Sequence, residues 1–175
     1  MTWFAPLKAS ALLTLPLLVS VSFSEACFDF LSARQSSALR DLDMINPARA
    51  IEAMQVMNAS LRNPLFGAVY FGTPFALTLA VVMMAVLRAR VAAAVLGLGL
   101  AVHMIGVFGG IVAPNVPLNR ELAAVDARAP GGDTIWRAYS TRWQSANLSR
   151  MIAAGGSLML VAATLTAAVQ NRRRS

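Results

Sequence analysis

Three ionisable residues lie inside long apolar stretches, where charged side chains are uncommon. Glu25 and Asp29 are four residues apart, so a helix places them on one face, and His103 is the only histidine. An isolated charge in hydrocarbon is costly, so acids in such surroundings usually face a protein interior or water. The two carboxylates could accept a proton, ligate a metal or pair with an arginine. His103 could join Glu25 in a carboxylate–imidazole site or act as a general base.

A structural interpretation of these residues is also open. The carboxylates could form a wetted pair at the rim of the protein, or bridge to Arg150, and a lone histidine is often a hydrogen-bonded packing residue. One histidine with two carboxylates is a weak metal set. The sequence has neither a phosphate loop nor a dinucleotide fingerprint, and a Ser-His-Asp arrangement could use only His103. No metal or cofactor is therefore indicated by a motif.

The positions of the apolar residues predict the fold class. Of 175 residues, 57% are hydrophobic and 13% are charged, whereas a soluble domain carries about 25% charged residues. Four apolar stretches stand out, at residues 9–31, 65–87, 91–113 and 151–169, and about 20 residues cross a bilayer as a helix. We therefore expect an all-α fold, a polytopic membrane four-helix bundle, in a single domain over residues 1–175.

The first stretch has an alternative interpretation as a cleaved signal peptide. Ser24-Glu25-Ala26 loosely resembles a cleavage site. The apolar stretch continues to Leu31, however, which is long for a signal peptide and favours retention. Cys27 is the only cysteine, so it forms no internal disulfide and we expect it to be buried.

The net charge of +7 is unevenly distributed along the chain. Lys8, Arg88, Arg90 and the arginines of 172–174 lie in short segments without acidic residues, while segments 32–64 and 114–150 hold nine arginines and six carboxylates. The positive-inside rule then predicts an inner (plasma) membrane protein with both termini cytoplasmic and the two long segments as external loops. The expected partners are the lipid bilayer, with anionic headgroups at the terminal arginines, and a lipophilic small molecule, but no nucleic acid.

The first external loop contains a predicted amphipathic helix. Asn46 suits the N-cap and Pro47 the first helical position. The residues that would then share one face are Ile51, Met54, Asn58 and Leu61. Asn63-Pro64 is expected to end the helix, which would pack on the bundle as a cap or lie on the membrane surface.

The second external loop is expected to hold a short helix over residues 119–126, capped by Asn119. Asp133 is expected to cap another helix, which runs unbroken from Thr134 into the fourth span. Within the spans, Pro74 predicts a kink that either widens a cavity or serves packing. The Gly106-x-x-x-Gly110 spacing predicts close approach of a neighbouring helix.

Several polar motifs resemble those of a known family. They are Met54-Gln55 with Asn58, Asn63-Pro64-x-Phe66, Asn115-Val116-Pro117-Leu118-Asn119, and Trp136 followed by Trp143-x-x-x-Asn147-x-x-Arg150. Together they resemble the anthrone-oxygenase-like family of small four-helix membrane proteins, from about residue 10 to about residue 168. One departure is Leu148, where family members often have a histidine.

The resemblance implies an oxygenase acting on a lipophilic, polycyclic aromatic substrate. Some fungal members are linked to oxygenation of anthrones to anthraquinones, without a known flavin or haem motif. Under this hypothesis Arg150, with Asn119 or Asn147, stabilises a phenolate or enolate, and Glu25 or His103 removes the activating proton. The remaining motif residues, Asn115 and Trp143, would help to bind substrate.

The alternative is a non-enzymatic scaffold, or a protein that binds or transports a small molecule. The asparagine and arginine side chains would then tie loop ends together, because both types offer several hydrogen-bonding atoms. Glu25, Asp29 and Arg150 would form a buried ion-pair network that fixes helix register.

Overall fold

The computed structural model describes residues 7–60 and 64–173, and this part of the chain is helices joined by short turns. The elements are α1 (Leu7–Leu42), α2 (Pro47–Ser60), α3 (Pro64–Val86), α4 (Arg90–Val102), the π-helical η1 (His103–Phe108) and η2 (Ile111–Asn115), α5 (Val116–Ala123) and α6 (Gly132–Arg173). The all-α prediction is therefore confirmed.

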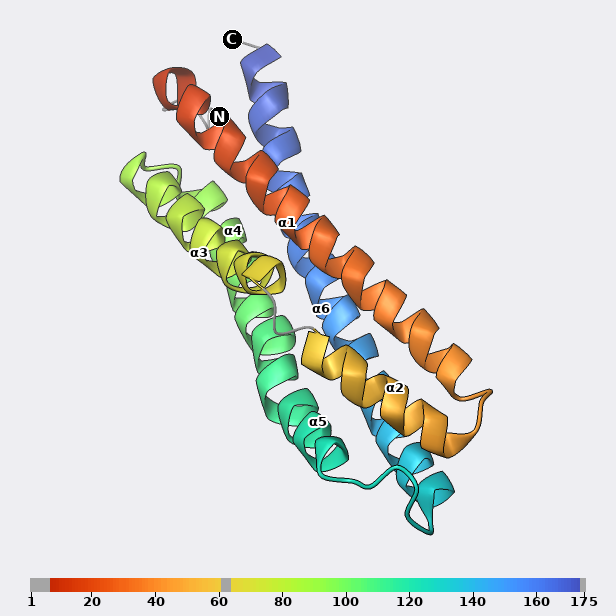
Figure 1. Ribbon diagram of the computed structural model, residues 1–175. Coiled ribbons are helices and arrows are strands. Elements are labelled where there is room, and N and C mark those ends of the chain that lie inside the picture. Colours follow the sequence, from red (N-terminus) through yellow and green to blue (C-terminus); the bar gives the residue numbers. More distant parts are fainter. Residues whose placement is uncertain (1–6, 61–63, 174–175) are drawn as a thin grey trace.

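The molecule is elongated, and α1 and α6 lie side by side along much of its length (Figure 1). α3 and α4 pack beside them in one half, whereas α2 and α5 surround the start of α6 in the other half. We call this second half the cap. The first turn of α1 and the last turn of α6 lie at the same end, opposite the cap.

Two helices in the described part of the chain are long and apolar enough to cross a membrane. They cover Arg90–Ala123 and Gly132–Gln170, while Leu18–Cys27 and Tyr70–Val86 are shorter apolar helical stretches. The first long helix contains the predicted span 91–113, and the second contains 151–169. The two shorter stretches fall inside the predicted spans 9–31 and 65–87, so the four-span arrangement remains a prediction.

The two segments predicted to be external are largely helical, and part of this helical structure is predicted from the sequence. α1 continues past residue 31 to Leu42, and α6 runs from Gly132 without a break, as expected from Thr134 onward. In the first segment, the N–H of Ala48 donates to Asn46 Oδ1 at 3.0 Å, and α2 begins at Pro47, so the predicted cap is confirmed. Leu61 and Asn63 lie outside the described residues.

The prediction that Asn119 caps a helix over residues 119–126 is wrong. The chain stays helical through Pro114, and α5 begins at Val116, so Asn119 lies inside α5. Proline usually interrupts a helix because it lacks an N–H and crowds the preceding turn. Here Pro114 lies in the wider π-helical turn of η2, where the i−4 hydrogen bond is not required.

The other local predictions have mixed outcomes. Asp133 lies in the first turn of α6 and forms an ion pair with Arg137 at 3.0 Å. Pro74 lies inside α3, and its kink stays a prediction. Cys27 is half-buried instead of buried.

The predicted close approach at Gly106 and Gly110 is confirmed. A Cβ atom at Gly106 would overlap the Cβ of Ala153 on α6, and one at Gly110 would lie 2.9 Å from Arg150 Cγ. The absence of side chains at both positions therefore lets α6 lie directly against this helix.

Three groups of buried apolar residues hold the helices together. One in the half opposite the cap includes Leu18, Leu77, Leu96 and Val161. One in the cap includes Leu39, Ile51, Leu122, Trp136 and Trp143. A small middle group consists of Tyr70, Val107 and Ala154, and the candidate site is built on either side of it.

Candidate active site

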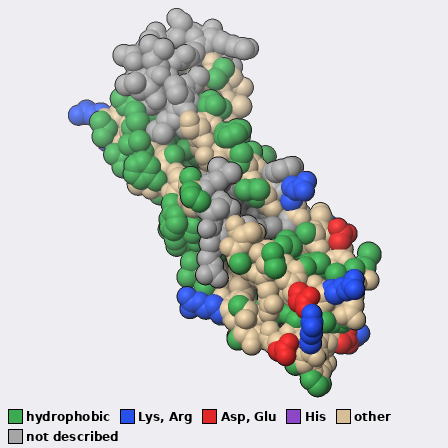
Figure 2. Space-filling model, viewed as in Figure 1, with side chains coloured by type: hydrophobic (Ala, Val, Ile, Leu, Met, Phe, Trp, Pro, Cys, Tyr) green, Lys and Arg blue, Asp and Glu red, His purple; other side chains and the backbone are tan. Residues whose placement is uncertain are grey.

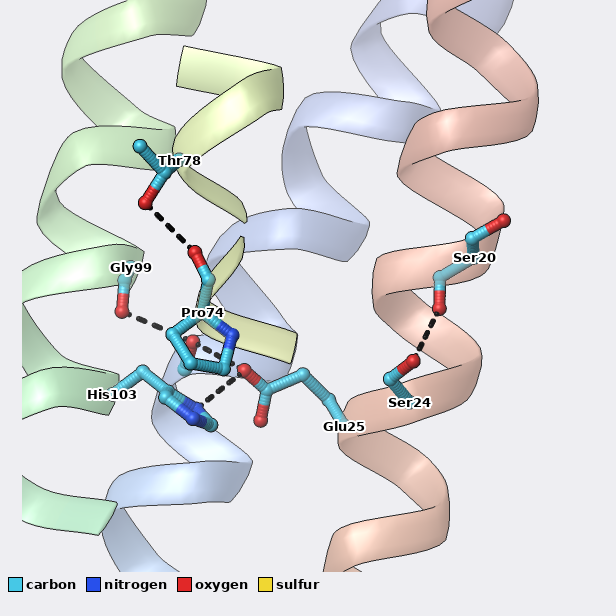
Figure 3. Close-up of polar contacts among 8 residues, drawn as sticks. Ser20, Ser24, Glu25, Pro74, Thr78, Gly99 and His103 are labelled. Atoms are coloured by element: carbon cyan, nitrogen blue, oxygen red, sulfur yellow. Dashed lines mark hydrogen bonds and ion pairs between the residues drawn. The ribbon is translucent and has the colours of Figure 1, made fainter. Parts of the chain in front are cut away.

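A carboxylate, an imidazole and a hydroxyl meet between three helices (Figure 3). His103 Nδ1 lies 2.8 Å from Glu25 Oε1, and Ser157 Oγ lies 3.0 Å from the same oxygen. Glu25 is 0% exposed and His103 is 2% exposed. We call these three residues, from α1, η1 and α6, the buried acid site. Among the interpretations of Glu25, a position beside His103 is observed. Arg150 lies seven residues, about two turns, before Ser157 on α6.

The π-helical segments determine which residues of this helix face α6. The fully buried positions between residues 99 and 115 are Gly99, His103, Val107 and Asn115, which are separated by four, four and eight residues. In a regular α-helix each four-residue step rotates by about 40°, so Asn115 would be turned by about 160° from Gly99. The wider π turns take up extra residues and cancel this drift, which keeps His103 and Asn115 in the interior.

A second polar group lies on α6 toward the cap. Arg150 is 5% exposed, donates to Asn147 Oδ1, and lies with its guanidinium carbon 5.9 Å from the centre of the Trp143 ring. Gly110 leaves the space that the Arg150 stem occupies. We call Trp143, Asn147 and Arg150 the arginine cluster, and among the described residues Trp143 Nε1 is buried without a hydrogen-bond partner.

Aromatic and small residues separate the two polar groups. Ala154 lies between Arg150 and Ser157 on α6, and Val107 lies between His103 and Gly110. Tyr70 of α3 packs with them and stacks on Phe108 with ring centres 4.8 Å apart. Because Arg150 and Ser157 are seven residues apart, they lie on one face of α6, about 10 Å apart along the axis.

The other predicted residues do not all join these two groups. Asn119 Oδ1 accepts a hydrogen bond from the Tyr139 hydroxyl at 2.8 Å, so it lies in the cap. Asn115 is buried, and its Oδ1 has no hydrogen-bond partner among the described residues. The side chain of Asp29 lies outside the described residues. Leu148 is 58% exposed, so a histidine at that position would face away from both polar groups.

Sequence reasoning missed two residues of this region. Ser157 continues the polar face of Asn147 and Arg150 at a spacing of seven residues, so extending that pattern would have found it. Tyr70 had no such signal, because its contacts with Phe108 and Ala154 are entirely tertiary.

The structure gives no support for a metal site in the described part of the chain, where no three His, Cys, Asp or Glu side chains come together. A surface groove of about 330 Å³ lies between α5 and α6 in the cap. It is lined by Leu118, Ile135, Tyr139 and Arg142, among others, and it does not include the buried acid site or the arginine cluster.

The sequence of the chain matches the model of a known protein family. The family model for anthrone oxygenase matches residues 64–160, which is more than half of the chain. The chain belongs to the anthrone oxygenase family. The matched region runs from α3 into α6 and includes His103, Arg150 and Ser157, whereas Glu25 lies before it. No curated protein and no solved structure matches the chain.

Proposed function

We propose that this member of the anthrone oxygenase family is a membrane enzyme that oxygenates a lipophilic aromatic ketone. The observation that carries the proposal is the pairing of Glu25 with His103 in the protein interior. Ser157, which contacts this pair, lies two turns of α6 from Arg150. A base and a cation on opposite sides of an apolar layer suit a substrate that loses a proton at one end and gains negative charge on oxygen at the other.

The reaction requires no reductant. The buried acid site removes a proton from the acidic CH₂ group, and the electron pair is delocalised onto the carbonyl oxygen as an enolate. Dioxygen then adds to the carbon, and protonation gives a hydroperoxide, which eliminates water to form the new carbonyl. The sum is R₂CH₂ + O₂ → R₂C=O + H₂O, in which dioxygen is the oxidant.

The arginine cluster is the proposed binding site for the enolate oxygen. The Arg150 guanidinium supplies positive charge, and Trp143 supplies an N–H that a substrate oxygen would satisfy. Asn147 positions Arg150 by accepting its hydrogen bond. We propose Trp143 in place of Asn119 as the second residue that binds the enolate oxygen, because Asn119 Oδ1 accepts a hydrogen bond from Tyr139 in the cap. For Asn115 we propose a contact with another part of the substrate.

The spacing of the two polar groups fits such a substrate. A carbonyl oxygen lies about 3 Å from its donor, and a reacting carbon about 3 Å from its base. Oxygen and carbon on opposite sides of one six-membered ring are separated by about 4 Å, given ordinary bond lengths. The total is comparable with the rise of about 10 Å along α6 between the backbones of Arg150 and Ser157.

The membrane is the proposed location of this chemistry. Large apolar side chains are exposed on the outer faces of several helices, including Phe23, Phe75, Leu98, Ile105 and Met159. Figure 2 shows apolar side chains over the half opposite the cap, and most of the charged ones on the cap. Soluble proteins rarely expose such extended apolar surface, whereas lipid would cover it in all four proposed spans.

Oxygen uptake tests the function directly. Purified protein in liposomes is given anthrone, a tricyclic ketone with an acidic CH₂ group, and dioxygen consumption is compared with that of protein-free liposomes. We expect Glu25→Gln to fall to the protein-free rate, and Arg150→Gln to lose about 100-fold or more, the usual cost of removing one oxyanion donor. Trp143→Phe tests the second donor.

Matched controls separate chemistry from general effects of substitution. Glu121→Gln and Arg142→Gln make the same chemical changes at exposed positions of the cap, and we expect both to retain activity. If the unmodified protein consumes dioxygen no faster than liposomes alone, the enzyme proposal is wrong. Co-purification of a lipophilic ligand without turnover would instead favour the binding or transport alternative.

A further inference from the structure

The two oxygens of the Glu25 carboxylate have different surroundings. Both neighbouring donors, His103 Nδ1 and Ser157 Oγ, lie within hydrogen-bond distance of Oε1. Oε2 is buried and has no hydrogen-bond partner among the described residues. Figure 3 shows the same asymmetry, with dashed lines at one carboxylate oxygen only.

This asymmetry distinguishes between the two candidate bases. Ser157 donates a hydrogen bond to Oε1 and His103 Nδ1 lies 2.8 Å from it, whereas Oε2 has no hydrogen-bond partner among the described residues. A buried acceptor without a partner is costly to leave unsatisfied, so Oε2 has the most to gain from an arriving proton. His103 meanwhile has its Nδ1 within 2.8 Å of Oε1 of the carboxylate.

We propose that Glu25 Oε2 is the atom that accepts the substrate proton, and that His103 and Ser157 are positioning residues that hold Oε1. This inference rests on the proposed function. The substrate C–H bond breaks, its electron pair stays on the substrate, and an O–H bond forms at Oε2. The proton later returns to the outer oxygen of the peroxide to give the hydroperoxide. The remaining C–H bond then breaks, its electron pair forms the new C=O bond, the O–O bond breaks, and the outer oxygen leaves as water with that second proton.

Ser157 is placed to respond to this transfer. Its Oγ lies 3.0 Å from Glu25 Oε1 and 3.1 Å from the backbone oxygen of Gly99, and one hydroxyl proton serves one acceptor at a time. While Glu25 is ionised, the hydroxyl donates to the carboxylate. Once Glu25 is protonated, the hydroxyl can turn to Gly99, so no buried donor is left without an acceptor.

Hydrogen exchange without oxygen isolates the proton-transfer step. Anthrone is incubated anaerobically in D₂O with protein in liposomes, and loss of its CH₂ protons is followed by NMR. We expect Glu25→Gln to lose all exchange above the protein-free rate. His103→Asn should keep the rate within about tenfold, because the asparagine amide nitrogen can occupy the position of Nδ1 and donate to Oε1 but is not basic. Loss of exchange in His103→Asn equal to that in Glu25→Gln would make His103 the base and overturn the proposal.

Ser157 is tested with a matched set on the same helix. Ser157→Ala should lower kcat of exchange about tenfold with KM unchanged, the expected effect of losing one hydrogen bond to a charged group, and Ser157→Thr should restore most of it. Ser149→Ala removes an exposed hydroxyl of α6 and should leave the rate unchanged. Equal kcat in Ser157→Ala and the unmodified protein would contradict the positioning role.

An infrared measurement separates this inference from the proposed function. The carboxylate band of Glu25 is obtained as the difference between the unmodified protein and Glu25→Gln, without substrate. We expect Ser157→Ala to shift this band, because Oε1 loses a donor, whereas an unchanged band would overturn the contact. If the band shifts but the unmodified protein does not exchange anthrone protons, the proposed function is wrong. The assignment of Oε2 as the proton acceptor is then also wrong, whereas the contact between Ser157 and Oε1 is confirmed.

Discussion

One tyrosine in the cap connects residues from three helices. The Tyr139 hydroxyl of α6 donates to Asn119 Oδ1 of α5 at 2.8 Å, and Asn58 Nδ2 of α2 lies 3.4 Å from it. Gln55 of α2 adds hydrogen bonds to the backbone oxygens of Leu122 and Val125. Such bonds satisfy polar atoms between packed helices, so we propose a structural role for Asn119 in the cap.

We therefore expect Tyr139→Phe to lower the stability of the protein without changing its chemistry. The loss of the hydroxyl removes one hydrogen bond to Asn119 and a longer one to Asn58, which corresponds to about 1–2 kcal/mol. Thermal unfolding in detergent measures the change, and Thr141→Val, an exposed hydroxyl on the same helix, is the control. An unchanged melting temperature with lost anthrone turnover would show instead that the Tyr139–Asn119 pair acts on the substrate.

At the residue scale, local chemistry was predictable and partners were less so. Asn46 was correctly predicted as a cap because capping depends on neighbouring residues. Asn119 was assigned to the same role by the same rule, yet the helix that precedes it does not stop. The possible pairing of Glu25 with His103 followed from their rarity. The spacing along α6 could have indicated Ser157 as a polar position, but its contact with Glu25 becomes visible only once α1 and α6 are together.

At the scale of elements, the contact of α6 with α4 and η1 depends on residues without side chains. The Gly106 position faces Ala153 so closely that a Cβ would overlap it, whereas Gly97 of α4 has no atom within 4 Å of such a Cβ. The two glycines therefore differ in tertiary surroundings although both lie in the same long helix.

Substitution of these glycines by alanine should have opposite effects. Gly106→Ala forces α6 and η1 apart, and we expect a loss of about 1–3 kcal/mol, typical of overpacking. Gly97→Ala should leave stability unchanged or raise it, because alanine favours a helix more than glycine does. Unfolding midpoints of both variants measure the difference, and equal midpoints would contradict the observed packing.

At the scale of the whole molecule, charge is unevenly distributed over the surface. The cap carries most of the charged side chains in view, and apolar side chains are exposed along the described part of the other half (Figure 2). Arg90, at the start of α4, lies at the end opposite the cap, while Arg128 lies in the turn between α5 and α6. Under the proposed topology these two exposed arginines face opposite sides of the membrane.

Cysteine labelling tests that topology. Cys27→Ser provides a background without cysteine, and Arg90→Cys and Arg128→Cys are added to it separately. We expect a membrane-impermeant maleimide to label the Arg128→Cys variant in intact cells, and to label the Arg90→Cys variant only after permeabilisation. The reverse pattern would place the cap in the cytoplasm, and equal labelling of both in intact cells would contradict a membrane-spanning arrangement.

The sequence by itself determined the helical class, the position of both long apolar helices, the start of α2 and the family. These features depend on apolar periodicity, local capping and motif spacing, and all three are determined by residues that are close together in the sequence. Only the tertiary structure decided that Asn115 lies in a helix and faces the interior, and that His103 and Ser157 meet at one oxygen of Glu25. The reason is that π-helical turns and buried hydrogen bonds depend on the packing of α6 against its neighbours, which no local stretch of sequence encodes.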